Sequence, residues 1–235
     1  MLFSLEETND NEKTDDSDMT QLASHPYSVR EEILHAATHG VAAVAAVVCL
    51  VLLLLKVDSG VGGIVAVSLY GGAMIAMFAS STLYHSLFAT KAAGFLKMLD
   101  HSAIYLKIAG SYAPFALISL PTTIGVWVMI GAWGAAAVGI GFKLKAFLSN
   151  TGKKFNIISL LMYLAMGWAG VLMIVPLSDA LPAVAINWVI AGGLAYTIGA
   201  AFYAMKNLRY MHVVWHLFVV AGSACHFVAI YFYVL

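Results

Sequence analysis

The stretch Met211-His212-Val213-Val214-Trp215-His216 places two histidines at the start of an apolar run that continues to Leu235. On a helix, side chains four residues apart project from one face, so both imidazoles can reach the same metal ion. Ionisable side chains inside a membrane span are costly and usually mark a functional site. The stretch therefore predicts a transmembrane helix that carries two metal ligands. Two interfacial histidines that hydrogen-bond to their neighbours are the alternative.

The composition of the whole chain indicates a membrane protein. Of its 235 residues, 62% are hydrophobic and 10% are charged, whereas about a quarter of the residues in a soluble domain are charged. Cys49 and Cys225 both lie inside apolar runs. We therefore expect small buried thiols here, and no disulfide framework.

Seven runs of about twenty apolar residues predict an all-α polytopic membrane protein with seven transmembrane helices. The predicted spans are residues 35–56, 62–87, 99–120, 122–142, 155–176, 182–205 and 211–235. Residues 1–30 are acidic and poor in large apolar side chains, which predicts a disordered cytoplasmic tail ahead of a transmembrane domain at 31–235. The tail lacks the basic and apolar regions of a signal peptide.

The charges outside the spans predict the topology. Residues 1–32 hold nine acidic residues and two basic ones, whereas the remainder holds three acidic and ten basic residues. Most of these basic residues fall in the linkers that follow the second, fourth and sixth predicted spans. Because positively charged linkers stay in the cytoplasm, we expect a cytoplasmic N-terminus and a C-terminus outside.

Five polar side chains fall within two helical turns of the predicted cytoplasmic boundary: Ser81, His85, Asp100, His212 and His216. Three imidazoles with an open position for water are typical of a catalytic zinc site. A nearby carboxylate can orient this water or accept its proton. Zinc suits the site better than copper or iron, because nothing in the sequence indicates redox chemistry.

Other ionisable residues in the spans have alternative interpretations. His35 and His39 also lie four apart, near the predicted cytoplasmic boundary, so spacing alone does not exclude them as ligands. His101 points away from its acidic neighbour on a helix and is expected at the interface. His226 lies deeper and is expected to be a hydrogen-bonded core residue. Lys107 lies inside the third span and needs a cavity or a carboxylate partner.

Several runs of the sequence resemble one known family. They are Ser81-Thr82-Leu83-Tyr84-His85, Leu99-Asp100-His101-Ser102-Ala103-Ile104-Tyr105, Gly110-Ser111-Tyr112-Ala113-Pro114-Phe115, His212-Val213-Val214-Trp215-His216 and Cys225-His226-Phe227. The chain resembles the bacterial hemolysin III family from about residue 30 to its end. That family is related to the progestin and adipoQ receptors, including the adiponectin receptors, and distantly to alkaline ceramidases.

The resemblance implies a zinc ion held by His85, His212 and His216. It also implies that Asp100 and Ser81 lie next to the metal or contact its water, and that the protein resides in the bacterial inner membrane. Lys107 departs from the pattern, because an apolar residue is expected at this position in the family.

The leading expectation is a zinc-dependent hydrolase that cleaves an amide or ester of a membrane lipid. Asp100 would serve as general base, and Ser81 would donate a hydrogen bond to the water or the oxyanion. One alternative is a non-enzymatic membrane-homeostasis or receptor-like protein with structural zinc. The other alternative is a pore-forming cytolysin. The sequence argues against it, because it has neither a secretion signal nor alternating strand patterns. Membrane lipids are the expected partners, and nucleic acid is not.

Overall fold

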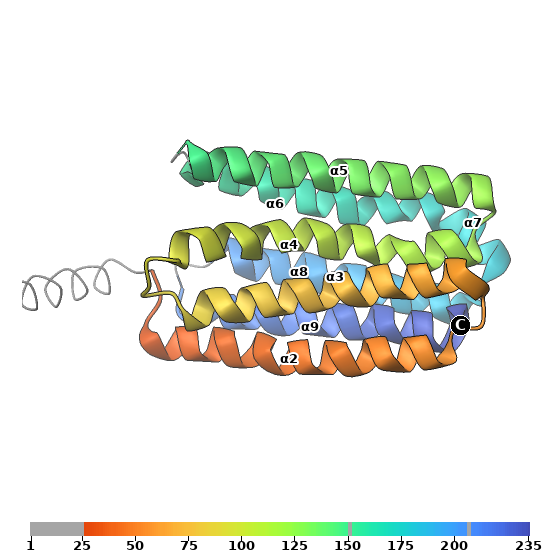
Figure 1. Cartoon of the computed structure of the whole chain (residues 1–235), viewed down its shortest axis with the longest axis horizontal. Coiled ribbons are helices and arrows are strands. Elements are labelled where there is room, and N and C mark those ends of the chain that lie inside the picture. The colour runs from red at the N-terminus through yellow and green to blue at the C-terminus, as the bar shows by residue number, and fades with distance from the viewer. Residues whose placement is uncertain (1–25, 150–151, 206–207) are drawn as a thin grey trace, which may run out of the picture.

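The computed structural model describes residues 26–149, 152–205 and 208–235, and within these ranges the chain forms helices and short connections without a strand (Figure 1). The expected all-α class is therefore confirmed, whereas most of the predicted acidic tail lies outside the described residues. The long helices are α2 (Val29–Lys56), α3 (Gly60–Ser86), α4 (Ala93–Pro114), α5 (Thr122–Leu148), α6 (Gly152–Trp168), α8 (Ala183–Ala204) and α9 (Met211–Ala229). The shorter elements are η1 (Phe115–Ser119), η2 (Ala169–Met173), α7 (Ile174–Ala180) and η3 (Ile230–Val234).

Six helical segments are long and apolar enough to cross a membrane: α2, α3, α5, residues 157–180, α8, and α9 with η3. The other long helix, α4, lies alongside α3 and α5 in the bundle (Figure 1). It differs from the six because it carries Lys97, Asp100 and Lys107. Large apolar side chains such as Leu55 and Leu172 are exposed on the outer surface, as expected where helices face lipid.

The first helix begins earlier than its apolar run. Ser28 caps α2: its hydroxyl accepts a hydrogen bond from the backbone N–H of Glu31, and the Glu31 carboxylate accepts one from the backbone N–H of Ser28. This reciprocal capping box starts the helix at Val29. The helix therefore begins more than one turn before residue 35, where the apolar span was expected to start.

The helices bring the predicted polar residues to one end of the bundle. The starts of α2, α4 and α9 and the end of α3 lie at the left of Figure 1, and the C-terminus lies at the opposite end. Close packing of α3 and α4 depends on Gly110, where an added Cβ would lie 2.8 Å from the carbonyl oxygen of Leu69. A small residue here lets the two backbones approach, as at many helix contacts in membranes.

Candidate metal centre

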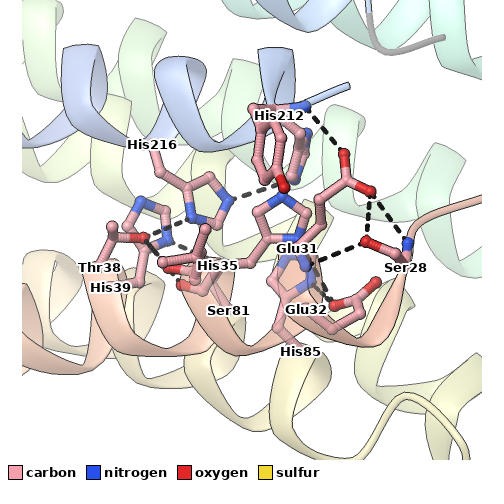
Figure 2. A network of polar contacts seen from close by, with 12 residues as sticks. Ser28, Glu31, Glu32, His35, Thr38, His39, Ser81, His85, His212 and His216 are labelled. Carbon is pink, nitrogen blue, oxygen red and sulfur yellow. Dashed lines mark hydrogen bonds and ion pairs between the residues drawn. The ribbon is translucent and has the colours of Figure 1, made fainter. Parts of the chain in front are cut away.

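Three of the predicted site residues meet inside the bundle. His85 comes from the last turn of α3, and His212 and His216 come from the first two turns of α9 (Figure 2). All three side chains are buried, and each offers a ring nitrogen within 4.8 Å of the others. The i, i+4 spacing therefore places His212 and His216 side by side on α9, and α3 supplies the third histidine.

The facing nitrogens of His212 and His216 fit a metal ion. The two Nε2 atoms lie 3.2 Å apart. Two nitrogens that bind one tetrahedral zinc at about 2.0–2.1 Å are themselves about 3.3 Å apart, by simple geometry. Among the described residues, Nδ1 of His212 has no hydrogen-bond partner. The donor set and the spacing therefore fit zinc.

The hydrogen bonds of Thr38 determine which nitrogen of His216 is available. Thr38 Oγ1 lies 2.8 Å from the carbonyl oxygen of Leu34 and 2.9 Å from that of His35, so its hydroxyl hydrogen is directed to the backbone. Thr38 Oγ1 also lies 3.2 Å from Nδ1 of His216 and must accept there. With the proton on Nδ1, the Nε2 lone pair of His216 faces His212 and can bind a metal.

A carboxylate that sequence reasoning missed contacts the histidines. Glu32 is fully buried, and its Oε2 lies 2.5 Å from Nδ1 of His85 and 3.6 Å from Nδ1 of His35. It forms a second group of potential metal-binding residues with His35 and His85. Metal-binding histidines usually donate their other N–H to such a carboxylate, which fixes the ring and raises its basicity. The sequence could have indicated this contact, because Glu32, His35 and His39 share one face of a helix.

His35 and His39 lie within the same cluster. The rings of His35, His85, His212 and His216 have centroid separations between 4.6 and 5.3 Å for all six pairs. Neither ring nitrogen of His35 has a hydrogen-bond partner among the described residues. His39 stacks on His216 with a centroid distance of 3.6 Å. Both histidines of α2 are therefore part of the centre.

The starts of α2 and α9 are tied together next to the cluster. Glu31 accepts a hydrogen bond from the backbone N–H of Tyr210, at 2.8 Å. Tyr210 has a φ of 63°, a left-handed conformation that is uncommon outside glycine. Tyr27 stacks on His212 with a centroid distance of 5.1 Å, and burial raises the pKa of the Tyr27 hydroxyl, which therefore stays protonated. These contacts hold the first turn of α9, and with it His212, against α2.

The two predicted catalytic residues line a cavity next to the cluster. Ser81, Asp100, His212 and His216 all contribute to this cavity, which has a volume of about 200 Å³. Ser81 Oγ lies 2.8 Å from Nδ1 of His39, and Asp100 is buried. Asp100 is not part of either group of potential metal ligands found among the described residues.

The remaining candidates line the same cavity further from the cluster. His101 is half-buried, and His226 Nε2 lies 3.3 Å from the carbonyl oxygen of Val189, as expected for a hydrogen-bonded core residue. Lys107 lines the cavity as well, so the first of its two expected environments is confirmed. Across the described residues, no carboxylate lies within ion-pair distance of Lys107.

Comparison with known proteins supports the resemblance suggested by the motifs. The family described as Haemolysin-III related matches residues 27–227, which includes every residue of the centre described above. The chain belongs to this family. It is 38% identical over 209 residues to Hemolysin-3 of Bacillus cereus, covering 88% of this chain and 93% of the relative. A Hemolysin-3 homolog of Bacillus subtilis (strain 168) is 35% identical over 209 residues, covering 88% and 96%.

The similarity extends to animals. The human Monocyte to macrophage differentiation factor is 30% identical over 173 residues, covering 70% of this chain and 68% of the relative. The recognition made from the histidine, serine and aspartate motifs is therefore confirmed at the level of the family.

Proposed function

We propose that this haemolysin-III related membrane protein is a zinc-dependent hydrolase of a lipid amide or ester. One observation carries the proposal: buried imidazoles that can hold a metal face an apolar cavity inside a bundle of membrane-spanning helices. A soluble substrate would have little reason to enter such a cavity, whereas an acyl chain is stabilised there by burial of its apolar surface.

His85, His212 and His216 are the proposed zinc ligands, with Glu32 holding the His85 ring and Thr38 holding the His216 ring. Zinc bound there would lower the pKa of a bound water to about 7 and polarise the substrate carbonyl.

The protein's own contributions to the reaction come from the cavity wall. Asp100 would accept the proton of the attacking water and return it to the leaving group, as a general base and acid does. Ser81, held by His39, would direct its hydroxyl to the water or to the developing oxyanion. The apolar walls would exclude bulk water, which strengthens these electrostatic interactions.

The test is lipid turnover by the purified protein in vesicles. A panel of N-acyl lipids and acyl esters would be incubated with zinc-loaded and chelator-treated protein, and released fatty acid would be measured by mass spectrometry. We expect release from at least one lipid class, loss of that release after chelation and its recovery with added zinc. Release that is unchanged by chelation would contradict a zinc-dependent reaction.

A structural role for the metal is the second candidate, and the position of His35 favours it. Four imidazole rings at nearly equal separations could enclose an ion and leave no position for water. Zinc would then join α2, α3 and α9 without catalysis. In the turnover experiment, this role predicts that chelation lowers the melting temperature while no lipid of the panel is hydrolysed.

We further propose that α4 is a seventh span, with the metal centre near the cytoplasmic face of a bacterial inner membrane. Its three charged residues are tolerated because Asp100 and Lys107 are buried within the protein. Basic linkers at the end of the bundle that holds the centre support this orientation.

Reporter fusions test this topology. A fusion at residue 10 is expected to report the cytoplasm, and one after Leu235 the opposite side. Alkaline phosphatase and a fluorescent protein that folds only in the cytoplasm give complementary readouts. Reporting of both ends from the same side would refute seven spans.

A further inference from the structure

Lys107 is a buried cation in the middle of the bundle, and the metal centre does not use it. Its side chain is 4% exposed. The ammonium donates hydrogen bonds to Ser111 Oγ at 2.9 Å and to the Tyr196 hydroxyl at 3.1 Å. It also lies 5.4 Å from the ring centroids of Tyr70 and Tyr196. All of these neighbours are neutral, so the positive charge is solvated but not neutralised by them.

A lone charge in this place is unfavourable. Moving an ammonium from water into a protein interior costs several kcal/mol even after relaxation, and an opposite charge is the usual compensation. As noted above, the described part of the chain supplies no carboxylate to Lys107. A bound anionic molecule can supply this counter-charge.

The cavity offers room for such a molecule beside Lys107. Lys107, Ser111 and Tyr196 all line it, and Ser223 Oγ, 3.0 Å from the Tyr196 hydroxyl, holds that hydroxyl in place. Most of the remaining cavity surface is apolar. The apolar walls include Phe115, Met173, Ile174, Leu177, Ile186 and Val189.

We propose that Lys107 and Tyr196 bind the carboxylate of a single-chain amphiphile, a long-chain fatty acid, whose alkyl chain lies along the apolar walls. One lysine balances one negative charge, which favours a carboxylate over a doubly charged phosphate monoester. The Tyr196 hydroxyl next to the ammonium can donate to one carboxylate oxygen, whereas Ser111 donates to the backbone carbonyl of Lys107 at 2.7 Å and holds the ammonium by accepting from it. The subsite is separate from the metal centre, since Lys107 lies seven residues beyond Asp100, about 10 Å along a helix. It does not depend on the proposed hydrolysis.

Binding of matched ligands to the intact purified protein tests the subsite. The probes are palmitic acid, hexadecanol and a lysophosphatidic acid with the same chain, each measured by equilibrium binding in detergent. We expect the acid to bind at least about tenfold more tightly than the alcohol, because a charge-assisted contact is worth more than 1.4 kcal/mol. Equal binding of acid and alcohol would overturn the proposal, as would tighter binding of the phosphate-bearing lipid.

Variants assign the preference to Lys107. Lys107→Met, which keeps length and removes charge, should bind acid and alcohol equally, whereas Lys107→Arg should keep the preference. Lys145→Met removes an exposed lysine on α5 and is the matched control, with native behaviour expected. A preference for the acid that persists in Lys107→Met would overturn the assignment. If Lys107→Met fails to fold, Tyr196→Phe, which removes one donor, should weaken acid binding without affecting the alcohol.

The origin of the ligand is tested with the metal-site variant His85→Ala. Fatty acid that copurifies with this variant comes from the surrounding membrane. Fatty acid that copurifies only with the parent, while the variant still binds added palmitic acid, comes from hydrolysis at the centre. Both outcomes leave the subsite intact, whereas failure of the variant to bind added acid would show that the metal centre and not Lys107 holds the carboxylate.

Discussion

Replacement of His85 by alanine is expected to reduce the zinc content of the purified protein from about one ion per chain to below about a tenth of that value. The ring of His85 lies with those of His212 and His216 in one buried group. Loss of a hydrogen-bonding partner behind a ligand already weakens binding 10–100-fold, so loss of the ligand itself should cost more. Zinc would be measured by mass spectrometry on protein washed with a weak chelator.

The control for this experiment is His226→Ala. That histidine lines the cavity but bonds to the Val189 carbonyl, outside the cluster. The His226→Ala protein should therefore keep its zinc. Full zinc occupancy in His85→Ala, His212→Ala and His216→Ala alike would exclude the site, whereas loss of zinc in His226→Ala as well would point to general unfolding.

Hydropathy and helical spacing were sufficient to predict the helices and three of the buried histidines. Long apolar runs have few alternatives in a membrane, because every backbone polar group must be satisfied within the helix. His212 and His216 follow from their i, i+4 spacing, and His85 from its place at the end of a span. The boundaries were less accurate, as the cap at Ser28 shows, because capping depends on a few polar residues outside the apolar run.

Glu32 was not predicted as part of the centre, because the capped first turn of α2 lies outside the apolar run. Apolar periodicity alone begins the first span at residue 35, which leaves Glu32 outside that span. The capping box extends α2 by more than one turn, and Glu32 then points into the cluster with His35 and His39. For Lys107, depth predicts burial and the i, i+4 spacing predicts the contact with Ser111 on the same helix. The contact with Tyr196 on α8 depends on tertiary packing and could not be predicted in this way.

Substitutions of Asp100 and of Glu32 are expected to affect different properties: the first lowers turnover, and the second lowers zinc affinity. Asp100→Asn keeps the shape of the side chain but cannot accept a proton, so it should retain zinc and lose turnover by about 10²–10⁴-fold, the usual contribution of a general base. Glu32→Gln weakens the hydrogen bond to His85 Nδ1 and should lower zinc affinity by about 10–100-fold. At saturating zinc, Glu32→Gln should recover most of its turnover, and Asp100→Asn should not.

The measurements are zinc affinity by competition with a chromophoric chelator, melting temperature, and fatty acid release in vesicles across a zinc titration. Asp58→Asn, an exposed residue in the connection after α2, is the matched control and should behave as the parent. Parent-level turnover by Asp100→Asn would remove Asp100 from the reaction. If Glu32→Gln bound zinc as tightly as the parent but lost turnover beyond recovery by zinc, the proton acceptor would be Glu32, since its carboxylate is the one in contact with a metal-binding imidazole.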